Sequence, residues 1–426
     1  MGVSDPVDLL RGLVGIPSLS GHEAEATRWL VAWMNGQGFD AAVDQAGNAV
    51  GIRGSGTRHV LLLSHIDTFP GEIPVRREGD WLTGRGAVDA KGSLCAFASA
   101  AAATDILPGW QLTVVGAVEE ETASSRGARH LLAAAAKPQY CVIGEPSGWE
   151  RLTLGYKGRL VADLQWRAAF SHSAGPGRLP AEQAVDIWSA VVAHCSQFNT
   201  GRETIFDRLD PSLRHIVTRD QGAYCSVEMT IGFRLPPSLQ PMALAGDIQR
   251  LVWAAHLAPR PVSPRNARDF SKTGDDRGLK VPLRPPCAPL RRQGTIENGG
   301  PPRDACGTVE NTGLSPLCGE ADTDDQRNCL VFSGQETAFR ADKSNPLVRA
   351  FLSAIRRTGG QPRFVLKTGT SDMNVVGPFW GVPIIAYGPG DSALDHTPEE
   401  RINLNEFLRA IEVIKNALEI LQRSTP

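Results

Sequence analysis

Long apolar runs, an excess of charge and paired cysteines are all missing from this sequence, and each absence excludes a class of protein. No stretch approaches the roughly 18 consecutive apolar residues of a membrane-spanning helix, and the N-terminus lacks the basic start and apolar core of a secretory signal. We therefore expect a cytoplasmic protein with no membrane partner. The chain has 44 Lys and Arg residues against 46 Asp and Glu residues, so no nucleic-acid partner is indicated.

Signs of cysteine chemistry are also missing. The eight cysteines contain no C-x-x-C pair, so neither a disulfide framework nor a thiolate zinc site is expected. Cys95, Cys141 and Cys195 lie in apolar stretches and are interpreted as small buried hydrophobic residues. What is present is a chain of 426 residues, 42% of them hydrophobic, which is enough for one large domain or two ordinary ones.

Apolar runs that alternate with helical stretches define the first part of the chain. The runs at residues 60–63, 112–118 and 140–143 are typical of strands buried on both faces. Ala-rich stretches at 93–103 and 128–136 separate them. This alternation predicts an α/β fold in which helices flank a mostly parallel sheet.

A first helix is predicted before these strands. Ser20 and Glu23 have the S-x-x-E spacing of a capping box, and apolar residues then recur at helical intervals over 29–34. Gly36 and Gly38 should end the helix, because glycine interrupts the periodic pattern.

From residue 160 the pattern changes to that of a smaller domain. A strand at 160–166, a helix at 180–198, a strand at 225–235 and a helix at 241–257 follow one another, and 331–333 can supply a closing strand. This order predicts an inserted two-layer α/β domain.

The first pattern returns near the end of the chain, with a helix from residue 345, a strand at 382–387 and a final helix at about 404–421. The catalytic domain is therefore predicted to comprise residues 1–158 and 335–426, with a lid and dimerisation domain at 159–334. Residues 258–328 inside the lid lose apolar periodicity and are rich in Pro, Arg, Gly and Asp. We interpret them as an irregular insertion without a catalytic role.

Five short polar stretches carry the candidate chemistry. They are residues 64–68, 84–92, 119–121, 144–147 and 395–397. Four of them come after an apolar strand, and the carboxyl ends of parallel strands share one rim of a sheet. Together they supply two histidines and several carboxylates, the donor set that holds a pair of zinc-like ions. A metal-dependent hydrolase is predicted, although the last stretch could also be the capped start of a helix at Pro398.

Simple chemistry suggests roles for several of these carboxylates. A pair of ions needs a bridging carboxylate, and Asp89 lies on a glycine-bracketed loop that can reach between two ions. Asp67 lies two residues past His65, on the same side of an extended segment, where it can accept the second ring N–H of that histidine. Of the three Glu residues at 119–121, one is needed as a ligand and one as the base that takes a proton from water.

The five motifs, in this order, resemble the metal-dependent aminoacyl amidohydrolases, a family that includes acetylornithine deacetylase, succinyl-diaminopimelate desuccinylase and glutamate carboxypeptidase. The resemblance covers about residues 5–257 and 330–422. It implies two divalent ions, zinc first and cobalt as the alternative, with Asp67 behind the ligands and Glu120 as the general base. The implied ligands are His65 and Glu145 for one ion, Glu121 and His396 for the other, and Asp89 between them.

The run of three glutamates permits two registers. We choose Glu120 as the base and Glu121 as the ligand because Gly127 lies six residues past Glu121, as in some members of the family. The other register would move both roles one residue toward the N-terminus. Glu119 is otherwise interpreted as a solvated acidic residue at a helix start.

The predicted lid is similar to that of the family in two elements. Residues 170–174 match its H-S-A element, which implies that His172 stabilises the tetrahedral oxyanion. Residues 232–236 match its R-x-x-P strand, which implies that Arg234 holds a substrate carboxylate. In dimeric relatives the lid histidine reaches the neighbouring site, so a homodimer formed through the lid is expected.

A glycine-rich loop and two short segments indicate a branch of the family. Gly369, Thr370 and Ser371 match a substrate loop whose N–H groups bind a carboxylate. Residues 155–159 and 367–374 look most like the branch that releases lysine or ornithine from the terminal Glu of an amino-group carrier protein, in lysine or arginine biosynthesis. The alternatives are a deacetylase or desuccinylase of small N-acyl amino acids, and an inactive relative that serves as a binding protein.

Overall fold

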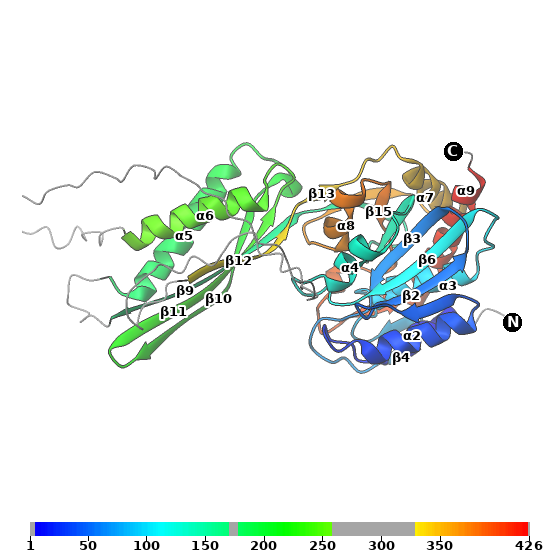
Figure 1. The fold of residues 1–426 in the computed structure, drawn as a ribbon, viewed down its shortest axis with the longest axis horizontal. Helices are drawn as coiled ribbons and strands as arrows, with labels where there is room; N and C mark the ends of the chain where they lie inside the picture. Colours follow the sequence, from blue (N-terminus) through cyan, green and yellow to red (C-terminus); the bar gives the residue numbers. More distant parts are fainter. Residues whose placement is uncertain (1–4, 170–177, 258–328, 425–426) are drawn as a thin grey trace, which may run out of the picture.

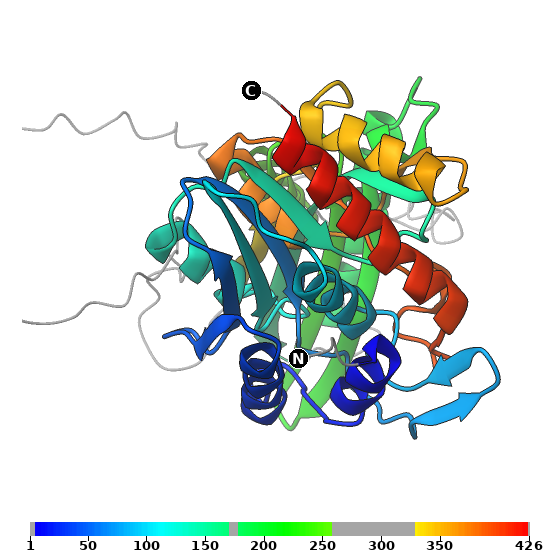
Figure 2. The same cartoon turned by 90° about the vertical axis from the view of Figure 1, so that its right-hand side faces the viewer.

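The computed structural model describes residues 5–169, 178–257 and 329–424 of the chain. Figures 1 and 2 show a large sheet wrapped by helices, and beside it a smaller sheet with two helices on one face. Among the described residues, none of the helices has the length and apolar character that a membrane crossing requires. The predicted insertion at 258–328 lies outside the described residues.

The large sheet has the predicted parallel centre. Its strand order is β1-β2-β6-β3-β7-β15-β8-β13, with β14 paired to β8. The central strands β6 (Trp110–Ala117), β3 (Arg58–His65), β7 (Tyr140–Gly144) and β15 (Ile384–Ala386) run parallel to their neighbours in this group. They contain the apolar runs of the sequence because a central strand is buried on both faces. The predicted fold class is confirmed.

The remaining strands of this body flank the centre or form a separate three-stranded sheet. Those in the large sheet are β1 (Asp40–Val43), β2 (Ala49–Gly54), β8 (Arg151–Tyr156), β13 (Phe339–Arg340) and β14 (Arg363–Lys367). Those in the three-stranded sheet are β4 (Arg76–Glu78), β5 (Trp81–Thr83) and β16 (Arg401–Asn403). Because β16 pairs with β5, the chain beyond residue 395 is fastened beside the loop at 84–92.

Helices cover both faces of the large sheet, and alternate residues of β3 show how. Val60 and Leu62 lie in one apolar core, whereas Leu61 and Leu63 lie in another on the opposite face. The helices of the first core are α1 (Pro6–Val14), α2 (Ala24–Gly36), α3 (Lys91–Ala102), α7 (Pro346–Arg357) and α9 (Leu404–Arg423). Those of the second core are α4 (Arg126–Ala134) and α8 (Asp372–Trp380).

The smaller body is the predicted two-layer α/β domain. Its antiparallel sheet has the order β10-β11-β9-β12, and α5 (Pro180–Phe198) and α6 (Pro241–Leu257) pack on one face. The strands are β9 (Gly158–Ala169), β10 (Asp210–Gln221), β11 (Tyr224–Leu235) and β12 (Cys329–Glu336). The sequence did not predict β10, because this edge strand is mostly exposed and has no apolar alternation.

The chain changes sheet twice. It leaves the large sheet after β8 and enters the small one with β9, and it returns between β12 and β13. These crossings support the proposed division into a catalytic domain of residues 1–158 and 335–426 and a lid of residues 159–334.

The capping box predicted for the helix that the structure shows as α2 is wrong. Helix α2 begins at Ala24 without a side-chain hydrogen bond to its first turn. Ser20 Oγ instead donates to Asp67 Oδ2 at 2.7 Å, and Glu23 Oε1 accepts the N–H of Gly21. The hydroxyl of Ser20 therefore donates its hydrogen bond to Asp67, which is distant in the sequence, instead of to the helix. The spacing of neighbouring residues cannot reveal such a distant acceptor.

Candidate metal centre

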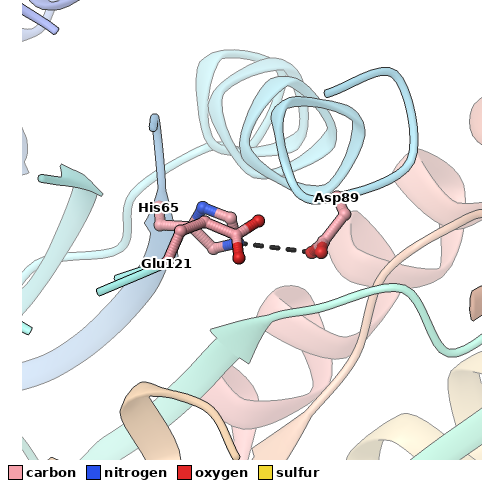
Figure 3. A group of neighbouring side chains, drawn as sticks. All are labelled: His65, Asp89 and Glu121. Atoms are coloured by element: carbon pink, nitrogen blue, oxygen red, sulfur yellow. Dashed lines mark hydrogen bonds and ion pairs between the residues drawn. The ribbon is translucent and has the colours of Figure 1, made fainter. Parts of the chain in front are cut away.

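Two strand ends and a helix start bring predicted metal donors together. His65 is the last residue of β3, Glu121 follows β6, and Asp89 comes just before α3. One side-chain ligand atom of each lies within 4.8 Å of the others. Figure 3 shows the three side chains turned toward one another. This place is the rim where the carboxyl ends of the parallel strands meet.

Asp89 lies between the two histidines of the site. Its Oδ1 is 3.3 Å from His65 Nε2, and its Oδ2 is 3.1 Å from His396 Nε2. Glu121 Oε1 is 3.0 Å from the same His396 nitrogen. Burial would raise the pKa of Asp89, but its hydrogen bonds to the two imidazoles hold this pKa well below the usual range. A carboxylate that presents a different oxygen to each imidazole fits a bridge between two ions.

His396 is the most exposed of these donors, and an aromatic ring fixes it. Its side chain is 41% exposed, and the ring of Phe69 stacks on it with a centroid distance of 4.3 Å. The alternative interpretation of this segment as a helix start is wrong, because no helix begins at Pro398. Helix α9 begins at Leu404 and is capped by Asn403.

Asp67 contacts candidate metal donors from two strands, His65 at the end of β3 and the glutamate segment after β6. Its Oδ1 accepts the backbone N–H of Glu120 at 3.1 Å, and its Oδ2 accepts that of Glu121 at 3.0 Å. His65 Nδ1 is 3.0 Å from the Asp67 carbonyl oxygen and 3.5 Å from Oδ1, so the backbone makes the closer contact with the ring. Burial would raise the pKa of Asp67, but hydrogen bonds from His65 and Ser20 lower it. The ionised carboxylate therefore fixes the segment that carries the glutamates.

The three successive glutamates make different contacts. Glu119 has a positive φ of 59°, and its carboxylate accepts Ser124 Oγ at 2.7 Å and pairs with Arg126 Nε at 2.9 Å. Glu121 contacts the last histidine, as described above. Glu120 lines the cavity beside the donors, and burial raises the pKa of its carboxyl well above the usual range. These contacts support the register in which Glu120 is the base and Glu121 a ligand.

Further carboxylates surround the donors, of which Glu145 and Asp372 are buried and Asp395 is half-buried. Burial, followed by the negative charge of Asp89, raises the pKa of Glu145 to about 8 and that of Asp395 to about 9. Burial also raises the pKa of Asp372 to about 7. So many acidic groups in one place are unfavourable unless cations balance them. With two imidazoles they make a donor set that fits two divalent ions, and Glu145 lines the same cavity.

A cavity of about 680 Å³ extends from the donors to the lid. The predicted substrate residues Arg234, Gly369 and Thr370 line it, and Arg234 Nη1 donates to Thr370 Oγ1 at 3.0 Å. Ser371, the third residue of the predicted loop, is buried and caps α8. His172 lies outside the described residues.

Sequence reasoning missed Glu400, whose carboxylate holds the backbone of the loop that carries Asp89. Its side chain is 1% exposed. Oε1 accepts the N–H groups of Val88 and Asp89 at 2.9 and 3.1 Å, and Oε2 accepts Arg85 Nη1 at 2.7 Å. Only its place four residues past His396 marked it in the sequence. Glu400 therefore ties the segment of the last histidine to the loop of the bridging candidate.

Glu400→Ala is expected to weaken metal binding by about 10- to 100-fold, the usual range for groups that orient metal ligands. The loss follows because the N–H groups of Val88 and Asp89 lose their acceptor. Glu400→Gln keeps one acceptor oxygen and should lose less. Calorimetric titration of the metal-free protein with zinc measures the affinity. The exposed neighbour Glu399 provides the control variant Glu399→Ala, and equal affinities of Glu400→Ala and this control would contradict the role.

The donors and the cavity define a metal-dependent hydrolase, because two ions beside a free carboxylate are suited to splitting an amide with water. The chain belongs to the peptidase family M20/M25/M40, whose family model matches residues 61–420. The resemblance drawn from the sequence motifs is thereby confirmed.

Curated relatives match nearly the whole chain. It is 40% identical over 417 residues to LysW-lysine hydrolase from Deinococcus radiodurans, with 96% of this chain and 95% of the relative covered. It is 34% identical over 419 residues to a putative LysW-lysine/LysW-ornithine hydrolase from Thermococcus kodakarensis, with 98% and 92% covered.

Solved structures of low sequence identity share the fold. An M20 metallo-carboxypeptidase from Sulfolobus solfataricus matches with a TM-score of 0.68 at 14% identity, covering 98% of this chain and 99% of the other. A dipeptidase from Saccharomyces cerevisiae matches with a TM-score of 0.69 at 12% identity, covering 99% and 96%. At such identities the likeness concerns the fold alone.

Proposed function

We propose that this protein hydrolyses the amide between the α-amino group of lysine or ornithine and the terminal Glu of the carrier protein LysW. The observation that carries the proposal is the 40% identity, over 96% of the chain, to a relative named LysW-lysine hydrolase. The site supports it, because Glu120, Arg234 and Thr370 line one cavity. An acylated amino acid can place its amide beside the glutamate and its carboxylate beside the arginine.

Two divalent ions would be held by His65, Asp89, Glu121, Glu145 and His396. We expect zinc, with cobalt as the alternative. Such ions, when bound, polarise the amide carbonyl and lower the pKa of water.

Glu120 is proposed as the residue that moves the proton. Its carboxylate lines the cavity and has no hydrogen-bond partner among the described residues. Glu120 takes a proton from the attacking water and returns it to the leaving amine. Arg234 and Thr370 bind the carboxylate of the amino acid and so orient the amide. His172, from the resemblance, would stabilise the tetrahedral oxyanion.

The cellular setting follows from the same proposal, and the expected assembly follows from the resemblance to dimeric relatives. Release of lysine or ornithine from a carrier is a step of lysine or arginine biosynthesis, and we expect it in the cytoplasm. We also expect a homodimer formed through the lid. Sedimentation velocity of the metal-loaded protein would distinguish a dimer from a monomer.

A competition assay tests the proposed substrate. The zinc-loaded protein is given lysine-loaded LysW, acetylornithine and succinyl-diaminopimelate, and the released amino acids are measured. We expect kcat/KM for the carrier adduct to exceed the others by at least about tenfold, since a site built for one acyl group discriminates at this level or better. Preference for acetylornithine or succinyl-diaminopimelate would instead identify a small-molecule deacylase. Bound metal without any turnover would identify a binding protein.

A further inference from the structure

Three arginines from adjacent strands of the lid sheet line the cavity. They are Arg159 on β9, Arg234 on β11 and Arg214 on β10. Arg159 and Arg234 are directly opposite each other in the ladder. Their neighbours Leu160 and Phe233 lie in the core under α5 and α6, so the arginines belong to the face that the helices leave open (Figure 1).

Arg214 occupies a bulge in β10. The ladder passes from Leu213 opposite Ile231 to His215 opposite Thr230, which leaves Arg214 without an opposite residue. A bulge of this kind redirects a side chain, and bulges recur beside active sites. The extra residue adds a guanidinium to the cavity wall while Leu213 still packs against the lid core.

Gly232, on the neighbouring strand, provides the space that Arg214 occupies. A Cβ at position 232 would lie 2.3 Å from Arg214 Nε and 2.8 Å from Arg214 Cζ. Both distances are far shorter than the usual carbon contact of about 3.5 to 4.0 Å. Any other residue at 232 would therefore displace the guanidinium, so two strands together determine its position.

The three guanidinium charges are balanced differently. Arg159 Nε pairs with Glu336 Oε2 at 2.9 Å. Arg234 donates to the neutral hydroxyl of Thr370, and Arg214 forms no ion pair with any described residue. Burial, and then the charges of Arg159 and Arg214, lower the pKa of Arg234 to about 10. Among the described residues, Arg214 and Arg234 thus line the cavity without an ion-pair partner, as expected of a site that receives carboxylates.

We infer that Arg214 is a specificity residue that binds a second substrate carboxylate, on the acyl side of the amide. The inference rests on the proposed function. A terminal glutamate has two carboxyl groups, and when one forms the amide the other remains free. Arg234 and Thr370 take the carboxylate of the amino acid. Arg214, which is exposed on the edge strand β10, binds the free carboxylate of the carrier's terminal glutamate, which enters the cavity from the solvent side.

This assignment explains how the enzyme distinguishes a carrier adduct from a small N-acetyl amino acid. The acetyl compound has only the carboxylate that Arg234 binds, whereas the glutamyl compound also satisfies Arg214. The planar guanidinium can donate two parallel hydrogen bonds to a carboxylate, and a lysine ammonium cannot reproduce this geometry. Discrimination therefore follows from a side chain that the sequence motifs do not include.

Two synthetic substrates test the inference. In both, acetylglutamate is joined through its side-chain carboxyl to the α-amino group of lysine. The main-chain carboxylate is free in one and is a carboxamide in the other. We expect the zinc-loaded enzyme to prefer the free carboxylate by about tenfold or more in kcat/KM, the range of a hydrogen bond between charged groups. Arg214→Gln should reduce this ratio toward one, mainly through KM, and Arg214→Lys should restore only part of it.

Two further variants test whether the substrate preference depends on the position of the Arg214 guanidinium or merely on the positive charge of the strand. Gly232→Ala keeps the charge but occupies the space of Arg214, so it should reduce the same ratio. Arg219→Gln removes an exposed arginine of the same strand that pairs with Glu228, and it should keep the ratio. A ratio that survives in Arg214→Gln would overturn the inference while the proposed function stands. A wild-type enzyme that cleaves neither substrate nor the LysW adduct would overturn both.

Discussion

Replacement of Glu120 by Gln is expected to lower kcat by at least about two orders of magnitude, the usual contribution of a general base, while the protein keeps its metal. Gln has nearly the shape of Glu but cannot take a proton from water. Glu120 lines the cavity but lies outside the group of ligand atoms formed by His65, Asp89 and Glu121. Steady-state hydrolysis together with metal analysis of the purified variant measures both properties.

Glu119→Gln is the matched control for this variant. Glu119 pairs with Arg126 and accepts the hydroxyl of Ser124, so its loss should leave kcat nearly unchanged. The comparison also tests the register of the three glutamates. A large loss in Glu119→Gln with near-normal turnover in Glu120→Gln would show that the roles lie one residue earlier. A Glu120→Gln protein without metal would show that Glu120 is a ligand.

Most of the candidate metal donors could be predicted from the sequence because they follow strands that the apolar pattern identifies. His65 ends one apolar run, Glu120 and Glu121 follow another, and Glu145 follows a third. Parallel strands bring their carboxyl ends to one rim whatever the details of side-chain packing. Knowledge of the strands was therefore enough to predict that His65 and Glu121 would meet, whereas Asp89 was predicted from its glycine-bracketed loop.

Glu400 and Arg214 could not be predicted from the sequence, because their contacts depend on pairing between distant segments. Glu400 and Asp89 are 311 residues apart, and they meet because β16 pairs with β5 beside the loop. Arg214 faces the cavity because β10 has one residue more than β11 at the bulge. Neither a strand pairing nor a bulge in an exposed edge strand leaves a periodic pattern in the sequence.

Removal of the metal is expected to abolish hydrolysis, and zinc or cobalt should restore it. Ligand atoms of His65, Asp89 and Glu121 lie within 4.8 Å of one another, and His396 Nε2 lies 3.1 Å from Asp89 Oδ2 and 3.0 Å from Glu121 Oε1. The measurement is the turnover of lysine-loaded LysW after treatment with a chelator and after addition of each metal. Undiminished turnover in a protein shown to be free of metal would contradict a metal-dependent mechanism.

The metal-free protein should also lose stability as pH rises. In the folded state the pKa of Glu145 is about 8, raised from the usual 4.5 by burial. The pKa of His396 is about 10, raised from the usual 6.5 by its hydrogen bonds to Asp89 and Glu121. Between about pH 5 and pH 9 the folded state therefore binds more protons than the unfolded chain, so a rise in pH favours unfolding. Asp89 stays ionised throughout this range and adds no pH dependence there.

Divalent ions replace these protons, so the stabilisation by metal should grow with pH. The unfolding temperature of the metal-free protein is expected to fall by about 5 °C or more between pH 6 and pH 9, and that of the zinc-loaded protein by less. Scanning calorimetry of both forms measures the difference.

Glu145→Gln identifies the cause of this pH dependence. Gln cannot ionise, so the metal-free variant should lose less stability between pH 6 and pH 9 than the metal-free wild type. Glu72→Gln, at an exposed position, serves as the control and should follow the wild type. Equal unfolding temperatures of the metal-free wild type at both pH values would mean that the buried acidic groups carry no excess protons. The crowding of carboxylates that makes the site suited to cations would then be absent.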